Sequence, residues 1–269
     1  MERLFFAALG QKGGLGNQLF QIAATIGIAR TNQLMPVFPE WWYDEAFERP
    51  LMRANYPADE SLPIYREESF SYRPVRITSS HIIDGYFQSE KYFGAFRSDI
   101  LAQFALKEEY RLLVDRLFRK YGMPDCAMHV RRGDYVDNDL FADLTLCGYY
   151  QHLLTQMGSN TKILVFSDDP DWCRAWFKDK RVVVANRSID VIDLFLFAKC
   201  NVSVIANSSY SWWGAWLNTN AKATVFAPNR WFIGEFADET QPFCSTPHYR
   251  GFHDTSDLLP PHWVRIGVE

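Results

Sequence analysis

The sequence lacks the patterns by which membrane, secreted and zinc-binding proteins are usually recognised. Its five cysteines are scattered, with no CxxC pair, so we expect free thiols in a reducing compartment. No apolar run approaches the ~20 residues that cross a bilayer, and "LFFAAL" at 4–9 is too short for the core of a signal peptide. We therefore expect a soluble cytoplasmic protein with no signal peptide, membrane anchor or transmembrane segment.

The chain also lacks the signatures of several other functional classes. Its formal net charge of −4 leaves no excess of basic residues, so no nucleic-acid partner is expected. There is no GxSxG elbow of a serine hydrolase and no HExxH pattern among the six histidines. The triplet "DND" at 137–139 is interpreted as a solvated loop, and we expect no metal site.

What the chain does contain is a regular alternation of strand-like and helix-like segments. Expected strands cover 3–9, 35–38, 81–87, 126–130, 162–166, 181–184, 201–206 and 223–227. Expected helices cover 18–30, 97–121, 171–177, 189–200 and 209–218, with loops and short helices over 39–74. Asp169 and Ser188 are predicted to cap two of these helices. The alternation predicts an α/β fold with parallel sheets, divided at the proline-bearing break at 122–125 into halves 1–122 and 123–269.

A glycine loop joins the first expected strand to its helix. Gly14 and Gly16 belong to "GGLGNQ", where backbone N–H groups and the helix dipole favour an anion. No Gly-Lys-Ser/Thr follows, and Leu19 stands where a dinucleotide fingerprint has its third glycine. A tight turn and an anion site are equally good interpretations, and Asn17 and Gln18 are the polar candidates for a sugar or phosphate.

The second candidate is "HVRRGDYV" at 129–136, directly after an expected strand. Arg131 and Arg132 would emerge at the carboxyl edge of the sheet, where open α/β sheets bind ligands. A guanidinium matches phosphate bidentately, and His129 is placed to touch phosphate or ligand hydroxyls. The equally weighted alternative is an arginine–aspartate salt bridge through Asp134 that closes a turn.

Two later strands also end in polar clusters. The first provides Ser167 and Asp168, with Asp169 assigned to helix capping. The second provides Asn207, Ser208 and Ser209 at a helix start, where hydroxyls and N–H groups suit an anion. At least one of Trp212 and Trp213 must pack inward. Polar clusters at three strand ends favour a ligand site over three clusters that each have only a local structural role.

Taken together, five segments resemble the α-1,2-fucosyltransferases of glycosyltransferase family 11. They are "GGLGNQLFQIA", "GYFQSEKYF", "HVRRGDY", "FSDD" and "ANSSYSWWGAWL". The segments fall in the family's order between residue 10 and about residue 218. The glycine and tryptophan segments are distinctive, whereas HxRRxD is shared more widely among fucosyltransferases. The resemblance implies a GT-B-like fold of two Rossmann-type halves with mainly parallel sheets facing a central cleft.

The resemblance also implies a reaction and a set of residues. GDP-fucose would be the donor, transfer to an acceptor glycan would invert the anomeric carbon, and no metal or other cofactor would be required. Arg131 and Arg132 would bind the donor diphosphate, and residues 123–269 would form the donor half. Residues 1–122 would form the acceptor half, with the C-terminal tail packing back on it. The expected donor-binding residues besides the arginines are Gly14, Gly16, Asn17, Gln18, Ser167, Asp168, Asn207, Ser208 and Ser209.

Further positions are candidates for the acceptor and for the chemistry. Gln88, Glu90 and Trp213 are expected to contact the acceptor. Asp134 is the first candidate for a general base, with Glu90 and Asp84 in reserve. The alternatives to fucose transfer are a transferase for another nucleotide-linked deoxyhexose and a non-catalytic module that binds nucleotide sugars or glycans.

Overall fold

A computed structural model describes residues 1–54, 62–233, 242–246, 249–252 and 254–267, with the side chains of 242–252 excepted. The chain forms two compact units, one made of 1–107 and 238–260 and the other of 108–237 and 261–269. The division falls after Lys107, ahead of the break at 122–125 indicated by the sequence. The helix over 108–120 packs against a helix of the second unit, and Lys199 of the second unit pairs with Asp115 at 2.5 Å between Nζ and Oδ1.

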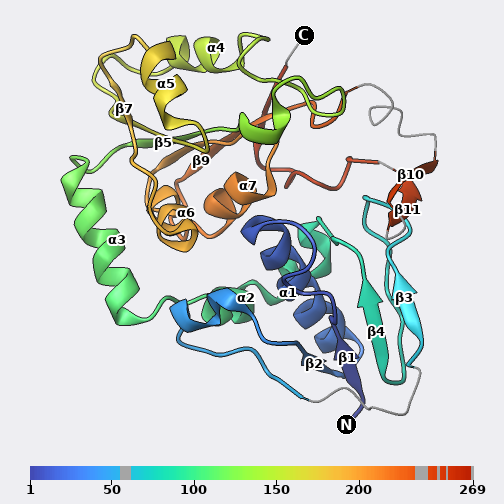
Figure 1. Cartoon of the computed structure of the whole chain (residues 1–269). Helices are drawn as coiled ribbons and strands as arrows, with labels where there is room; N and C mark the ends of the chain where they lie inside the picture. Colours follow the sequence, from blue (N-terminus) through green and yellow to red (C-terminus); the bar gives the residue numbers. More distant parts are fainter. Residues whose placement is uncertain (55–61, 234–241, 247–248, 253, 268–269) are drawn as a thin grey trace. The chain divides into compact units, whose positions relative to one another are not determined.

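The first unit contains a small parallel sheet (Figure 1). Its elements are β1 (Arg3–Phe5), α1 (Leu15–Thr31), β2 (Met35–Val37), η1 (Trp42–Ala46), β3 (Ile64–Arg66), β4 (His81–Asp84), η2 (Glu90–Tyr92), η3 (Gly94–Phe96) and α2 (Arg97–Gln103), with the hairpin β10 (Pro242–Thr246) and β11 (Tyr249–Phe252). The strand order is β2-β1-β4-β3, and all pairings within it are parallel. Chain order reverses between β1 and β4, so the carboxyl ends of these two strands flank a topological switch point.

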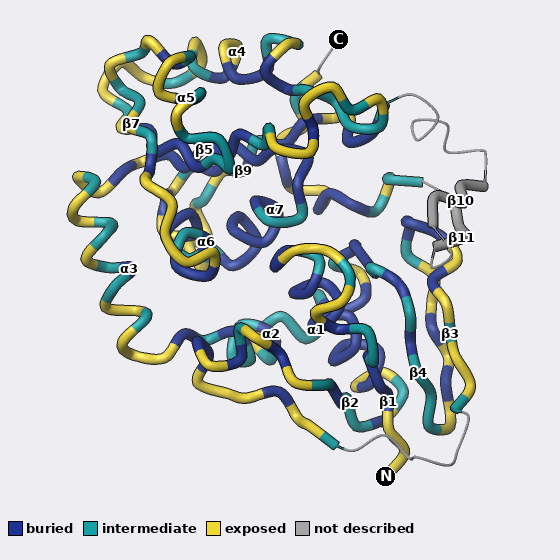
Figure 2. Tube along the Cα trace, viewed as in Figure 1, coloured by how far each residue is buried: buried dark blue, intermediate teal, exposed yellow. Residues whose placement is uncertain are grey.

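Helix α1 is mostly apolar and is buried along nearly its whole length (Figure 2). A helix of that composition belongs inside the protein. Gly27 allows close packing, because a Cβ at this position would overlap the carbonyl oxygen of Tyr92 in η2. The composition of α1 thus accounts for its position as a buried helix of the first unit.

The second unit contains a larger, doubly wound sheet with helices on both faces (Figure 1). Its elements are α3 (Glu108–Lys120), β5 (Cys126–Val130), η4 (Gly133–Tyr135), α4 (Tyr149–Gln156), β6 (Ile163–Ser167), α5 (Pro170–Trp176), β7 (Val182–Val184), α6 (Asp190–Ala198), β8 (Val202–Val204), α7 (Ser209–Trp216), β9 (Thr224–Pro228) and β12 (Val264–Ile266). The strand order is β12-β9-β8-β5-β6-β7, and every pairing is parallel. In chain order this is the 3-2-1-4-5-6 arrangement of dinucleotide-binding folds, with its switch point between β5 and β8.

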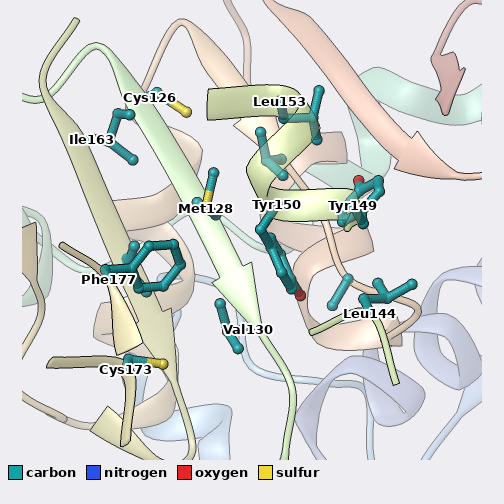
Figure 3. Close-up of a cluster of buried hydrophobic side chains, with 13 residues drawn as sticks. Cys126, Met128, Val130, Leu144, Tyr149, Tyr150, Leu153, Ile163, Cys173 and Phe177 are labelled. Atoms are coloured by element: carbon teal, nitrogen blue, oxygen red, sulfur yellow. The ribbon is translucent and has the colours of Figure 1, made fainter. Parts of the chain in front are cut away.

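One face of β5 builds the core beneath α4. Met128 and Val130 point toward Tyr150 of this helix within a cluster of buried side chains (Figure 3). Because strand side chains alternate between faces, His129 points to the opposite face, where its ring lies 5.5 Å from that of Tyr210 in α7. All five residues of β5 are buried, so the histidine lies on a face of this strand that is itself covered by the protein.

Most expected elements are present, with several corrections. The strands expected over 3–9 and 81–87 are shorter and end at Phe5 and Asp84. The helix expected over 97–121 is broken between α2 and α3, because Leu106 bridges to Phe47 and leaves the helical path. Helix α4 and strands β3, β10, β11 and β12 were not expected. Ser188 does not cap α6, because the N-cap of this helix is Ile189. The backbone N–H of Ser188 donates to Asp193 Oδ2 at 2.9 Å. The expected cap of α5 is confirmed, with Asp169 Oδ1 accepting from the backbone N–H of Trp172 at 3.1 Å.

The described cysteines fit the expectation of free thiols. Those at 126, 147, 173 and 200 form no disulfide, and three of them are buried. The side chain of Cys244 lies outside the described residues. None of the helices in the described ranges combines the length and apolarity that crossing a bilayer requires.

Candidate functional site

In the second unit, two of the predicted clusters meet at the switch point between β5 and β8. Arg131 follows the carboxyl end of β5, and Asn207 follows that of β8. Tyr135 ties the two loops together, because its hydroxyl donates to the backbone oxygen of Asn207 at 2.8 Å. In open α/β sheets, ligands bind outside the carboxyl ends of the strands at such a point. The topology therefore marks this edge as the candidate site.

Arg131 lies over this switch point and is held by two carboxylates. Its Nη2 is 2.5 Å from Asp134 Oδ1, and its Nη1 is 2.9 Å from Asp168 Oδ2. The guanidinium also stands 5.5 Å from the centre of the Tyr135 ring. The side chain of Arg131 is 32% exposed, so it is fixed in orientation while remaining accessible to a ligand.

Arg132 turns away from the switch point toward α5. Its guanidinium lies 3.7 Å from the centre of the Trp172 ring, a close cation–π contact. Its Nε is 3.5 Å from Asp169 Oδ2, and its side chain is only 14% exposed. The sequence did not separate the two arginines, whereas their neighbours do: Arg131 faces the candidate site and Arg132 packs on a helix.

Asp168 fastens the loop that carries both arginines. Its Oδ1 accepts from the backbone N–H of Arg132 at 2.9 Å, while its Oδ2 pairs with Arg131. Gly133 makes room for this carboxylate, because a Cβ at position 133 would overlap Asp168 Oδ2. Ser167 is also used within the fold, with its hydroxyl accepting from the backbone N–H of Asp169 at 3.0 Å. Both side chains, predicted to read a base or ribose, serve first to shape the loops.

The cluster is not positively charged as a whole. Arg131 and Arg132 contribute two positive charges, and the aspartates at 134, 168 and 169 contribute three negative ones, a net of −1. The salt-bridged turn is present. It leaves Arg131 accessible, so the interpretation as a ligand site stays a prediction. A diphosphate would have to displace Asp134, the most exposed of these carboxylates at 64%.

His129 is buried below the arginine loop. Only 5% of it is exposed, and within the described part of the chain its Nδ1 has no hydrogen-bond partner. Burial first, and the positive charge of Arg131 second, lower the pKa of His129 to about 3. The imidazole is therefore neutral at physiological pH and would meet a ligand as a hydrogen-bonding group, without the charge that holds a phosphate.

The end of β8 is mostly occupied by structural contacts. The side-chain nitrogen of Asn207 donates to the backbone oxygens of Ala142 at 3.1 Å and Trp231 at 3.0 Å. Ser208 and Ser209 stand at the start of α7 without a side-chain cap bond, so backbone N–H groups at this helix start remain candidates for an anion. The expectation that Trp213 contacts the acceptor is wrong for this structure, because the residue is 0% exposed and packs against Trp212 and Trp216.

In the first unit, the glycine loop and the loop after β4 are joined at the switch point between β1 and β4. Lys12 forms an ion pair with Asp84, and Gln88 Nε2 donates to Asn17 Oδ1 at 2.7 Å. Two segments separated by about seventy residues thus form one polar cluster. The ion pair engages Asp84, one of the two reserve candidates for a general base.

The glycine loop itself combines turn geometry with polar contacts. Gly13 has a φ of +70°, a conformation that other residues rarely adopt. Gly14 is the N-cap of α1, and Gly16 lies in its first turn. Gln18 is occupied internally, because its Nε2 donates to the oxygen of Gly13 at 2.9 Å and its Oε1 accepts from Trp41 Nε1 at 2.7 Å. Asn17 is therefore the loop's remaining polar candidate.

Several residues that shape these sites were missed by the sequence analysis. The hydroxyl of Tyr150 donates to the oxygen of His129, and that of Tyr149 to the oxygen of Ile205, both at 2.9 Å. These bonds secure the ends of β5 and β8 from below. The adjacent tyrosines in the sequence were the one signal that could have indicated these contacts. For the buried Glu67, described below, the sequence offered none.

No group of three or more histidine, cysteine, aspartate or glutamate side chains in the described ranges is arranged to hold a metal ion. In the "DND" loop at 137–139, the side chain of Asn138 makes hydrogen bonds to the backbone on either side of it. Asn138 Nδ2 donates to the oxygen of Asp134 at 2.9 Å, and Asn138 Oδ1 accepts from the N–H of Leu140 at 2.8 Å. The requirement for a metal or cofactor stays a matter of prediction.

Comparison with known proteins places these features in a family. The model of glycosyl transferase family 11 matches residues 60–245. The O-antigen biosynthesis glycosyltransferase WbnK of Escherichia coli is 33% identical over 175 residues, covering 60% of this chain and 58% of the relative. An α-1,2-colitosyltransferase of Escherichia coli is 28% identical over 200 residues, covering 68% and 61%. The galactoside 2-α-L-fucosyltransferase Sec1 of Mus musculus is 27% identical over 293 aligned residues, covering 96% and 73%. The chain thus spans about three fifths of the length of the first two relatives.

Solved structures show the same fold. The fucosyltransferase NodZ from Bradyrhizobium superposes with a TM-score of 0.51 at 16% identity, covering 80% of this chain and 92% of that chain. The apo form of POFUT1 gives a TM-score of 0.52 at 12% identity, covering 84% and 97%. At these identities the likeness concerns the fold alone, and it confirms the expected GT-B-like class with two mainly parallel sheets.

Proposed function

Because this chain belongs to glycosyl transferase family 11, we propose that it transfers L-fucose from GDP-fucose to a galactose O2 hydroxyl of an acceptor glycan. The reaction inverts the anomeric carbon and proceeds without a metal or other cofactor. The observation that carries this proposal is the position of Arg131 at the switch point between β5 and β8, accessible and oriented by two carboxylates. That position suits the diphosphate of a nucleotide sugar.

The second unit is proposed to bind the donor. Arg131 contacts the diphosphate after the exposed Asp134 side chain rotates away, and the start of α7 adds backbone N–H groups. As the bond between fucose and phosphate breaks, negative charge accumulates on the leaving diphosphate. A guanidinium already in place stabilises this charge more in the transition state than in the ground state, which lowers the barrier.

Asp134 is proposed as the general base for the attacking hydroxyl. It is the carboxylate released from Arg131 when the donor binds, so donor binding would both form the clamp and free the base. A positioned base contributes about 10²–10⁴-fold to such a reaction. Glu90 in η2 of the first unit is the reserve.

The first unit is proposed to bind the acceptor. Its candidates are Gln88 and Glu90 after β4, with Asn17 beside Gln88. Amide and carboxylate groups of this kind suit the hydroxyls of a sugar. The predicted contact of the glycine loop with the donor stays a prediction.

The relatives support the chemistry and leave the donor sugar to be tested. One is described as a galactoside 2-α-L-fucosyltransferase and another as an α-1,2-colitosyltransferase. The second favours an alternative in which the donor carries another deoxyhexose. A non-catalytic module that binds nucleotide sugars is the third possibility.

A transfer assay separates these three functions. The protein is incubated with GDP-fucose, or with a GDP-linked dideoxyhexose, and a panel of β-galactosides without added metal, and the release of GDP and the product are measured. The proposal expects a fucosylated galactoside whose anomeric configuration, read by NMR, is opposite to that of the donor. Product only with the dideoxyhexose would select the alternative donor, and binding of GDP without product would select the module.

A further inference from the structure

Glu67 is a buried carboxylate that the proposed reaction does not use. It directly follows β3, and only 4% of it is exposed. Burying a carboxylate is costly unless hydrogen bonds replace its water. Its contacts therefore show what it does in the fold.

Both oxygens of Glu67 accept backbone N–H groups from the loop after β4. Oε2 accepts from Tyr86 at 2.6 Å, and Oε1 accepts from Phe87 at 2.9 Å. Phe87 has a φ of +53°, a backbone conformation that a non-glycine residue holds only when its surroundings impose it. Gly85 lets the loop approach, because a Cβ there would overlap the Glu67 side chain. The loop is thus shaped around the carboxylate.

This loop leads directly into the acceptor candidates. Gln88 is the next residue and donates to Asn17 at 2.7 Å, and Glu90 opens η2 two residues later. A change in the direction of the backbone at Phe87 would move the side chain of Gln88. Glu67 itself is too buried to touch a substrate.

We infer that Glu67 is a positioning residue for the acceptor, which fixes the backbone at residues 85–87 so that Gln88 and Glu90 are presented at the switch point of the first sheet. The inference rests on the proposed function, since it takes the acceptor role of Gln88 and Glu90 from there.

The strength of the hydrogen bonds between Glu67 and the loop depends on the charge of the carboxylate. Burial raises the pKa of this carboxyl to about 7, against the effect of the two N–H groups, which favour the ionised form. An ionised carboxylate makes stronger hydrogen bonds than a neutral one. Acceptor binding should therefore weaken as the pH falls below about 7. The charged or titratable groups around Glu67 are Tyr65, Arg66 and Glu68 beside it in sequence, Arg73, Asp84 with its partner Lys12, Tyr86 and Tyr92.

The test compares Glu67→Gln with Glu68→Gln, the same change at an exposed neighbour. At pH 8, Glu67→Gln should raise the acceptor KM about fivefold, because an amide can accept only one of the two N–H bonds well. The donor KM should stay within about twofold, and Glu68→Gln should match the wild type in both constants. Between pH 8 and pH 6 the acceptor KM should rise in the wild type and stay flat in Glu67→Gln.

A wild-type acceptor KM and pH profile in Glu67→Gln would overturn the inference. Should this variant fail to fold, Glu67→Asp takes its place: the shorter carboxylate should raise the acceptor KM, and an unchanged value would overturn the inference. Absence of transfer by the wild type would contradict the proposed function instead. Hydrogen exchange then decides the role of Glu67, with the Tyr86 and Phe87 amides expected to lose protection in Glu67→Gln, and unchanged protection counting against it.

Discussion

At the scale of single residues, the two adjacent arginines lie in different surroundings. Arg131 is accessible over the switch point, whereas Arg132 lies over the ring of Trp172 and is mostly covered. The sequence "HVRRGDYV" gave both the same weight, because spacing along a loop does not show which way each side chain turns. Their difference can be tested by separating stability from transfer.

Arg132→Ala should mainly destabilise the protein. It removes the cation–π contact with Trp172 and the packing of the arginine stem, which together contribute about 1–2 kcal/mol. Urea unfolding should show this loss, while kcat for transfer stays within about threefold of the wild type. The control is Arg174→Ala on α5, the helix that carries Trp172. It removes a more exposed arginine and should lower the free energy of unfolding by less than about 0.5 kcal/mol. A large drop in kcat with wild-type stability would instead place Arg132 in the donor site.

Asp134→Asn tests the proposed general base. We expect kcat to fall about 10²-fold or more. The affinity for GDP should stay equal or increase, because a negative charge beside the diphosphate is removed. Transfer kinetics and GDP titration measure the two effects separately. A wild-type kcat in this variant would remove Asp134 from the chemistry and leave Glu90 as the candidate.

At the scale of elements, alternation along the chain predicted most of the strands because the strands are apolar and end in turn residues. The failures have local physical causes. The helix expected over 97–121 breaks because Leu106 forms a bridge with Phe47, a tertiary contact that outweighs helix propensity. Helix α4 begins after Gly148 at a φ of +75°, and its short, mixed sequence gave no clear period. Strand β3 has three residues, too few for an alternating pattern.

The candidate site follows the same division. The strand ends carrying Arg131 and Asn207 could be identified from the sequence, since motifs directly follow apolar runs. That these ends are neighbours depends on strand order, and that the side chain of Asn207 faces inward depends on Ala142 and Trp231. Neither fact is visible in residue spacing.

Tyr135→Phe tests the link between η4 and the end of β8. The change removes the hydroxyl that donates to the oxygen of Asn207 and leaves this buried acceptor without that donor. We expect the free energy of unfolding to fall by about 1–2 kcal/mol. Urea titration checks the value, and a crystal structure of the variant should show the 131–135 loop displaced from β8. An unchanged stability would mean that the two loops are held together by other contacts.

At the scale of the whole molecule, the buried ionisable groups make stability depend on pH in opposite directions. The pKa of His129 is lowered to about 3, so its contribution is lost as the pH falls from about 6.5 toward 3, where the unfolded chain binds the extra proton. The pKa of Glu67 is raised to about 7, so the stability it contributes is full below about 4.5 and is lost as the pH rises through 7.

Replacing His129 isolates one of these effects. On acidification from pH 7 to pH 4, the wild type should lose free energy of unfolding relative to His129→Asn. The loss should be about 1.4 kcal/mol for each pH unit below the unfolded-state pKa of histidine. Urea unfolding at several pH values measures it, and the contribution of Glu67 cancels in the difference. A difference independent of pH would show that the imidazole is not held neutral.

The central claim, that Arg131 is the diphosphate contact of a nucleotide-sugar site, is tested most directly by calorimetric titration. GDP and guanosine are titrated into the wild type and into Arg131→Ala, so that the ligand and the protein each lose one half of the proposed contact. The account predicts that Arg131→Ala lowers the affinity for GDP by about 10²-fold and leaves the affinity for guanosine unchanged. Equal GDP affinity in the two proteins, or an equal loss for both ligands, would contradict it.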